Sequence, residues 1–76
     1  MDVDEYKAAF GRHLRTLRRL RGTTQEELAY RAGIHVVYLS GIERGVRNPS
    51  LKNIRAIAMA LNAWTADLFA FETDDS

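Results

Sequence analysis

The spacing of hydrophobic residues along the chain predicts helices from end to end. Between residues 4 and 21, apolar side chains recur every three or four positions, which gives the segment one apolar face. These residues are Phe10, Leu14, Leu17 and Leu20. The same spacing returns in residues 51–61. No run alternates with the period of two that is typical of a β-strand, so the sequence predicts an all-α fold.

Capping residues divide the middle of the chain into short helices. Thr24 and Glu27 have the spacing of a capping box, which predicts a helix over residues 25–32 that ends at Gly33. A third helix is expected at residues 36–43, a fourth at 51–61 after Ser50, and a last turn of helix near 65–71. We therefore predict one compact five-helix domain over residues 1–76, with frayed ends at residues 1–4 and 73–76.

The second and third predicted helices are separated by only a few residues, the arrangement of a helix-turn-helix. Ala29 is small enough for two helices to cross closely, and Gly33 can adopt the positive φ that reverses the chain. In a helix-turn-helix, the second of the two helices enters the DNA major groove.

The distribution of charge favours an anionic partner for the middle of the chain. All eleven basic residues lie between Lys7 and Arg55, where there are only three acidic residues, a net charge of +8. The flanking segments carry the other seven acidic residues. A basic body with acidic ends is typical of a protein that binds an anionic partner. The alternative is a solvated helix surface with acidic caps.

Several other classes of protein are not favoured. The chain has no cysteine and only two well-separated histidines, so we expect no metal site. We see no catalytic arrangement, no glycine-rich phosphate loop and no sign of a cofactor or small-molecule ligand, and we predict that the protein is not an enzyme. The longest apolar run, Ala56–Leu61, is too short to span a membrane, and the acidic N-terminus is unlike a signal peptide. We expect a cytoplasmic protein.

Two segments carry a family resemblance: LRRLRGTTQEELA (residues 17–29) and YLSGIERGVRNPSL (residues 38–51). They resemble the phage-repressor and Cro-type (Xre) helix-turn-helix family, whose fold is lambda repressor-like. Within that family the chain is similar to the small controller proteins of restriction–modification systems. The resemblance implies a homodimeric, autoregulatory transcription factor that binds double-stranded DNA at a palindromic operator. It also implies a bacterial or phage protein that is associated with the nucleoid.

The resemblance also implies roles for individual residues. Gln25 would contact a phosphate, and the outer face of the recognition helix would include Gly41. Other residues implied to contact DNA are His35, Val36, Val37, Tyr38, Ser40, Arg44, Arg47 and Asn48. Arg18 and Glu43 match a family pair that forms an internal salt bridge.

The two valines depart from the controllers, which tend to place a long polar residue and a threonine there. Because valine offers only methyl groups, we predict that Val36 and Val37 contact thymine C5-methyl groups. The alternative is that Val36 turns inward and packs on the second helix.

An aromatic cluster follows the fourth helix. A chain of 76 residues has little room to bury all of it, so we predict a homodimer interface centred on Trp64, Leu68 and Phe69. The alternative is that these residues close the core of a single chain. Two other functions stay open. One is an antitoxin-type protein-binding module, for which the acidic tail Glu72–Ser76 could serve, and the other is a phage-type repressor.

Overall fold

Side-chain caps mark the start of the first helix in the computed structural model, which describes residues 1–73. Helix α1 (Val3–Leu20) begins after Asp2, whose carboxylate accepts the backbone N–H of Glu5 at 2.8 Å. The Glu5 carboxylate accepts the Asp2 N–H in return, at 3.0 Å. Val3 and Asp4, which we expected in a frayed end, therefore belong to the first turn. Residues 74–76, which include most of the acidic tail, lie outside the described residues.

The remaining helices follow the predicted order. They are α2 (Gln25–Ala32), α3 (Val36–Glu43), α4 (Leu51–Ala60) and the 3₁₀ helix η1 (Thr65–Thr73). The predicted caps are present: Thr24 Oγ1 accepts the Glu27 N–H at 3.0 Å, and Ser50 Oγ accepts the Asn53 N–H at 3.1 Å. Residues 1–73 form five helices and no strand, so the all-α prediction is confirmed.

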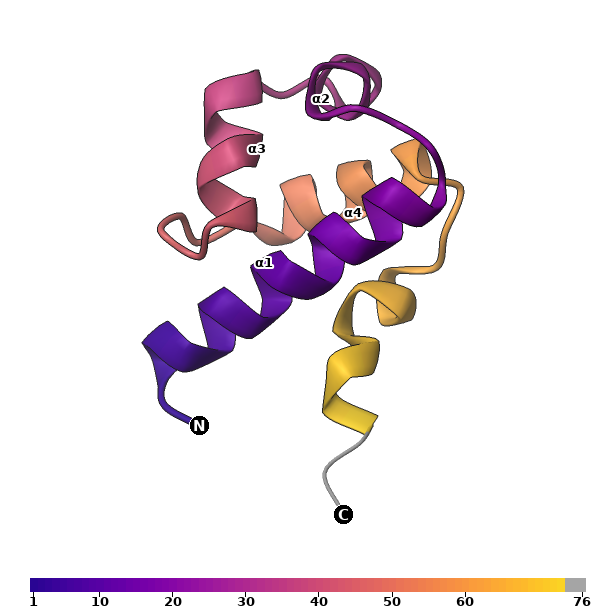
Figure 1. Cartoon of the computed structure of the whole chain (residues 1–76). Coiled ribbons are helices and arrows are strands. Elements are labelled where there is room, and N and C mark those ends of the chain that lie inside the picture. Colours follow the sequence, from indigo (N-terminus) through magenta and orange to yellow (C-terminus); the bar gives the residue numbers. More distant parts are fainter. Residues whose placement is uncertain (74–76) are drawn as a thin grey trace.

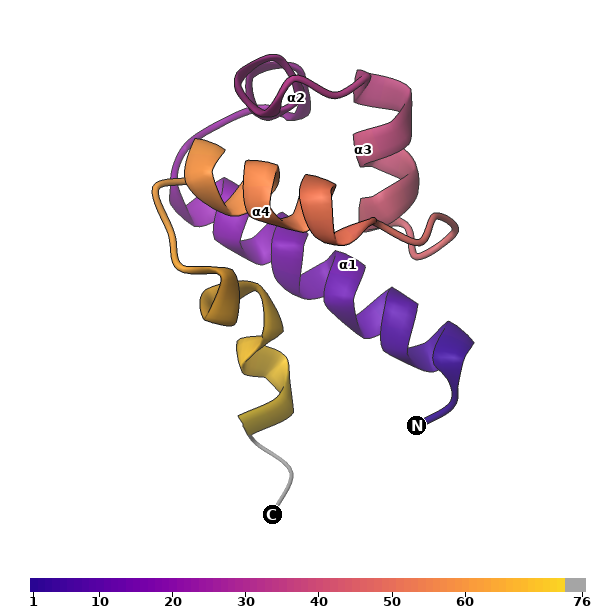
Figure 2. The same ribbon diagram turned by 180° about the vertical axis from the view of Figure 1, so that it is seen from behind.

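The five helices close into a ring around the core. Helix α1 packs against α3 and η1, α2 packs against α3 and α4, and α4 packs against η1. Figure 1 shows α3 and α2, the latter viewed along its axis, above the long α1. Figure 2 shows the molecule from behind, with α4 in front of α1. Because each helix touches two neighbours, the short helices gain stability from packing that they lack alone.

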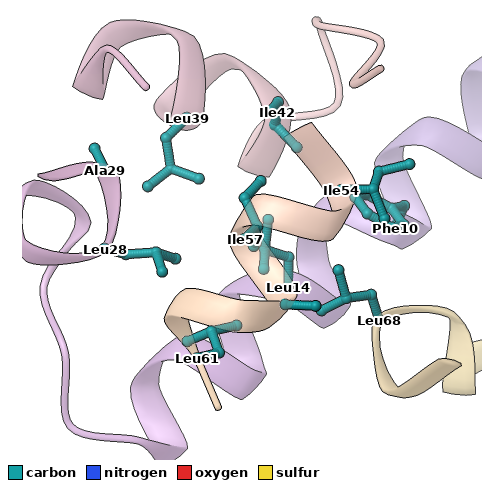
Figure 3. Close-up of a cluster of buried hydrophobic side chains, with 11 residues drawn as sticks. Phe10, Leu14, Leu28, Ala29, Leu39, Ile42, Ile54, Ile57, Leu61 and Leu68 are labelled. Carbon is teal, nitrogen blue, oxygen red and sulfur yellow. The ribbon is translucent and has the colours of Figure 1, made fainter. Parts of the chain in front are cut away.

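The core fills the inside of this ring (Figure 3). Every helix contributes at least one buried apolar side chain. The larger ones are Phe10, Leu14, Leu28, Leu39, Ile42, Ile54, Ile57, Leu61 and Leu68. At about 25 cal/mol per Å² of apolar surface removed from water, this burial is the main force that holds the fold together.

Helix α1 crosses the end of α3 at very close range. Gly11 lies at the crossing, where a Cβ atom would overlap the carbonyl oxygen of Ile42 and lie 2.5 Å from that of Glu43. Gly45 follows α3 with a φ of +79°, and a Cβ there would lie 2.7 Å from the Ala8 Cα. Only glycine leaves room for this approach of two backbones.

Helix η1 is bound to α1 along much of its length. Tyr6 Oη donates to Glu72 Oε2 at 2.7 Å, and His13 Nε2 donates to the Asp67 carbonyl oxygen, also at 2.7 Å. The bond to Glu72 raises the pKa of Tyr6, because the hydroxyl must keep its proton to donate. Aromatic rings fill the space between these polar contacts.

Candidate nucleic-acid interface

The turn between α2 and α3 depends on Gly33. Its φ of +70° lies in the left-handed region, which glycine adopts without strain. The Ile34 N–H then donates to the Ala29 carbonyl oxygen at 3.0 Å, which closes the end of α2. Ala29 itself is buried against α3. The two helices thus have the helix-turn-helix arrangement that the sequence predicted.

The inner face of α3 is fixed by core packing. Leu39 and Ile42 are fully buried, and Val36 is half-buried and packs against the core. This packing favours the alternative prediction, in which the Val36 side chain turns inward. Val37 is different, since 60% of its surface is exposed. Consecutive residues in a helix point about 100° apart, so Val36 can face the core while Val37 faces solvent.

The outer face of α3 consists of Val37, Ser40 and Arg44. These residues are spaced three and four apart, so they lie along one side of the helix. Val37 and Arg44 are exposed and Ser40 is partly exposed. The outer face therefore offers one apolar group, one hydroxyl and one positive charge.

His35 caps the N-terminus of α3. Its Nδ1 accepts the backbone N–H of Val37 at 3.1 Å. A neutral imidazole that accepts at Nδ1 carries its proton on Nε2. The exposed side chain of His35 therefore presents a hydrogen-bond donor at the start of the outer face.

Gly41 faces inward to the loop after α3, contrary to our expectation that it lines the outer face. A Cβ at Gly41 would lie 2.5 Å from Arg47 Cγ. The Gly41 carbonyl oxygen also accepts the N–H groups of Val46, at 2.9 Å, and Arg47, at 3.2 Å. The glycine lets the stem of Arg47 lie across α3, which keeps this exposed arginine beside the outer face.

The other two predicted contact residues lie in different surroundings. Tyr38 is partly buried, and its hydroxyl accepts a hydrogen bond from Asn53 Nδ2 at 3.2 Å, which ties α3 to α4. Asn48 is exposed in the loop that leads to α4. Tyr38 therefore supports the position of α3, whereas Asn48 is free to meet a ligand.

A buried carboxylate joins the first three helices. Glu43 is only 1% exposed, and Arg18 binds it through Nε at 2.7 Å and Nη2 at 3.0 Å. The bond to Glu43 raises the pKa of Arg18, so the guanidinium stays charged. Gln25 Nε2 donates to the same carboxylate at 2.9 Å, and Arg15 Nε lies 3.6 Å from it. The expected partners Arg18 and Glu43 therefore lie together, and Gln25 joins them.

An open hollow of about 610 Å³ lies beside this junction, at the N-terminus of α2. We call it the arginine hollow. Its lining residues are Arg15, Arg18, Arg19, Gly22, Thr23, Thr24, Gln25 and Glu26. Arg15 and Arg19 were not among the predicted contact residues, although their four-residue spacing on α1 places them on one face. Free backbone N–H groups and the helix dipole make such a helix start attractive to phosphate.

Comparison with known proteins identifies the fold family. The family model described as Helix-turn-helix matches residues 14–64, which contain α2, the turn and α3. This chain belongs to that helix-turn-helix family. The family resemblance drawn from the sequence is therefore confirmed.

Relatives within the helix-turn-helix family include proteins named as controllers. Control protein C.BamHI of Bacillus amyloliquefaciens is 43% identical over 72 residues, 93% of this chain and 89% of that protein. Control protein C.SmaI of Serratia marcescens is 36% identical over 62 residues, 82% of this chain and 70% of that protein. The structure of the restriction-modification controller protein C.AhdI from Aeromonas hydrophila aligns with a TM-score of 0.82 and 44% identity, over 83% of this chain and 96% of that one.

The predicted dimer residues of this helix-turn-helix protein separate into two groups. Leu68 is fully buried in the core of its own chain, and Phe69 is half-buried with its ring centroid 5.0 Å from that of Phe10. The prediction that Leu68 meets a partner is wrong, because it has no exposed surface. Trp64 is 80% exposed. Leu51 and Met59, at opposite ends of α4, are also exposed.

Residues 1–73 show neither a metal site nor a helix that spans a membrane. No group of three or more His, Cys, Asp or Glu residues in this part of the chain is placed to hold a metal ion. No single helix there is long and apolar enough to cross a membrane, and the combined segment of α4 and η1 is bent by 104°.

Proposed function

We propose that this protein is a sequence-specific DNA-binding transcriptional regulator that controls a restriction–modification operon, its own promoter included. The main support for this proposal is that the chain presents both an exposed outer face of α3 and the arginine hollow. The relatives named as control proteins supply the operon type. Such a regulator acts on the bacterial chromosome in the cytoplasm.

The two surfaces supply two kinds of contact. In the arginine hollow, Arg15, Arg19 and the backbone N–H groups at the start of α2 bind phosphates and set the register on the duplex. The Gln25 side chain adds a phosphate contact through the amide hydrogen that is not bound to Glu43. These contacts carry no sequence information by themselves.

The outer face of α3 reads the base edges. His35 supplies a donor, Ser40 a hydroxyl and Arg44 a charged donor, which match acceptors such as guanine O6 and N7. Arg47 and Asn48 contact the backbone or the next bases from the loop, and Tyr38 holds α3 in place against α4. Sequence preference then arises from a few side chains on one rigid helix.

Salt dependence tests DNA binding directly. Fluorescence anisotropy would compare a duplex from the region upstream of the chain's own gene with a random duplex at 50 and 200 mM salt. A protein with several phosphate contacts loses about 10³-fold or more in affinity over this range, because counterions are released on binding. The upstream duplex should bind more tightly than the random one at both concentrations. Absence of binding to either duplex contradicts the proposal.

A matched pair of arginines tests the arginine hollow. Arg19→Ala should weaken binding to all duplexes and lower the salt slope by about one contact. Arg31→Ala, at the opposite end of α2, removes the same charge outside the hollow and should leave the slope unchanged. Equal effects of the two variants would assign the slope to general charge and not to the hollow.

We also propose that the regulator is a homodimer through the outer side of α4 and the turn after it, with Leu51, Met59 and Trp64 at the interface. All three are exposed apolar side chains: Leu51 begins α4, Met59 lies near its end, and Trp64 lies in the segment between α4 and η1. Two protomers would then present their α3 helices to successive major grooves, roughly 34 Å apart, on a palindromic operator.

Sedimentation at micromolar concentration tests the interface. Trp64→Ala should shift the protein to monomer, and Tyr30→Ala should not, because Tyr30 is an exposed aromatic residue on α2, away from the proposed surface. A Trp64→Ala protein that is folded and fully dimeric excludes this interface.

A further inference from the structure

Val37 is an apolar side chain on an otherwise polar outer face. It lies in the first turn of α3, with 60% of its surface exposed, while Val36, Leu39 and Ile42 pack inward. An exposed valine contributes nothing to the core, and its methyl groups cannot make a hydrogen bond. Where α3 meets a ligand, Val37 can therefore contribute only an apolar contact.

The position of Val37 is fixed before any ligand arrives. Its backbone N–H is held by His35 Nδ1 at 3.1 Å, and the helix behind it is anchored by the buried Leu39 and Ile42. A β-branched side chain in a helix also has one strongly preferred rotamer. The two methyl groups of Val37 therefore keep one orientation relative to the helix, and little side-chain entropy is lost when they contact a ligand.

The chemistry of the major groove limits what these methyl groups can meet. The apolar feature on the major-groove edge of the bases is the C5-methyl group of thymine. Cytosine has a hydrogen at C5, but 5-methylcytosine carries a methyl group on that same ring atom. An apolar contact at C5 therefore separates methylated from unmethylated pyrimidines, and it does not separate thymine from 5-methylcytosine.

We propose that Val37 reads the C5-methyl group of a pyrimidine, so that the affinity for DNA responds to C5 methylation of the base that faces it. The proposal rests on the DNA-binding function proposed above. It replaces the prediction of two thymine-reading valines with a single reader, and it adds a modified base to what that reader accepts. Binding to the promoter would then depend on the methylation state of the operator.

The test uses synthetic duplexes of the upstream region that the wild-type protein protects in footprinting. In one series each thymine in turn is replaced by uracil, which removes only the methyl group. In the other series each cytosine in turn is replaced by 5-methylcytosine, which adds only that group. Wild-type protein should bind about fourfold more weakly to the duplex with uracil opposite Val37, the value expected for one buried methyl group. If cytosine occupies that position, methylation should strengthen binding by the same factor.

Two variants assign the effect to a residue. Val37→Ala should bind with nearly equal affinity to methylated and unmethylated duplexes, with circular dichroism to show that it is folded. Val46→Ala is the matched control, because Val46 is an exposed valine of similar exposure, 58%, in the loop after α3. This variant should keep the methyl effect.

The possible outcomes are distinct. If the wild type binds the promoter but ignores every methyl change, or if Val37→Ala stays as sensitive as the wild type, Val37 is not a methyl reader while the proposed function stands. If Val46→Ala loses the effect and Val37→Ala keeps it, the reader is in the loop and the assignment fails. If no protected region exists, both the proposed function and this inference fail.

Discussion

Replacing Gly11 with alanine measures the cost of the close crossing between α1 and α3. In an ordinary helix interior this change stabilises a protein by about 1 kcal/mol. At Gly11 the new methyl group would overlap the Ile42 carbonyl oxygen and lie 2.5 Å from that of Glu43. Both oxygens belong to the backbone, so the overlap is relieved only if the two helices move apart.

The structure sets the size of the effect. Forcing a methyl group into a packed site costs about 1–3 kcal/mol. Separation of α1 from α3 also lengthens the two Arg18–Glu43 hydrogen bonds, which join the same helices and now measure 2.7 and 3.0 Å. The weakened hydrogen bonds add about 1 kcal/mol, which offsets the gain of about 1 kcal/mol in helix propensity, so we expect a net loss of about 2 kcal/mol. In a domain of this size that lowers the melting temperature by roughly 8–16 °C.

Gly41→Ala is the matched control, because it makes the same change inside another helix. There the new methyl group meets Arg47 Cγ, part of a flexible side chain that can move aside. Gly41→Ala should therefore be neutral or stabilise the fold by up to about 1 kcal/mol. Thermal melts followed by circular dichroism, at equal protein concentration, compare the two. A Gly11→Ala protein as stable as Gly41→Ala would refute the close crossing.

Three further changes test other contacts. Glu43→Ala leaves the Arg18 charge buried without its partner and should cost about 3–5 kcal/mol in urea denaturation, so an unchanged midpoint would contradict the role of this pair. Tyr6 donates to Glu72 only while its hydroxyl is protonated, and this bond raises the pKa of Tyr6 above the usual value of about 10. The bond therefore stabilises the fold below pH 10, and this stabilisation is lost as the pH rises through the raised pKa. Tyr6→Phe should remove that part of the alkaline loss of stability, and equal alkaline profiles of the two proteins would argue against it. His35→Ala should lower stability by about 1 kcal/mol through loss of the α3 cap. His35→Asn should retain it, and the idea fails if asparagine is no better than alanine.

The sequence allowed the helices and their ends to be predicted because these depend on local chemistry. The capping box at Thr24 and the left-handed residue Gly33 each act within a few positions along the chain. The helix-turn-helix could be predicted for the same reason, since its turn is short. The family motifs then placed the recognition surface on α3.

The orientation of individual side chains could not be predicted in the same way. Helix α3 has only eight residues, and apolar ones occupy several sides of it, so periodicity did not decide between Val36 and Val37. Leu68 was misplaced because the sequence does not show how η1 folds back onto α1. Gly11 was missed because its constraint comes from α3, some thirty residues further along the chain, and becomes visible only when the two helices cross.

The inward and outward sides of α3 serve different purposes: one fixes the helix in the fold, and the other is exposed. The contacts that hold the helix in place come from Val36, Leu39, Ile42 and Glu43, and the side chains offered to solvent are those at positions 37, 40 and 44. The outward positions can therefore change without disturbing the inward ones. Substitutions at these outward positions should therefore change operator preference with little effect on thermal stability. During divergence, regulator and promoter can then change together in small steps, each of which leaves a folded protein.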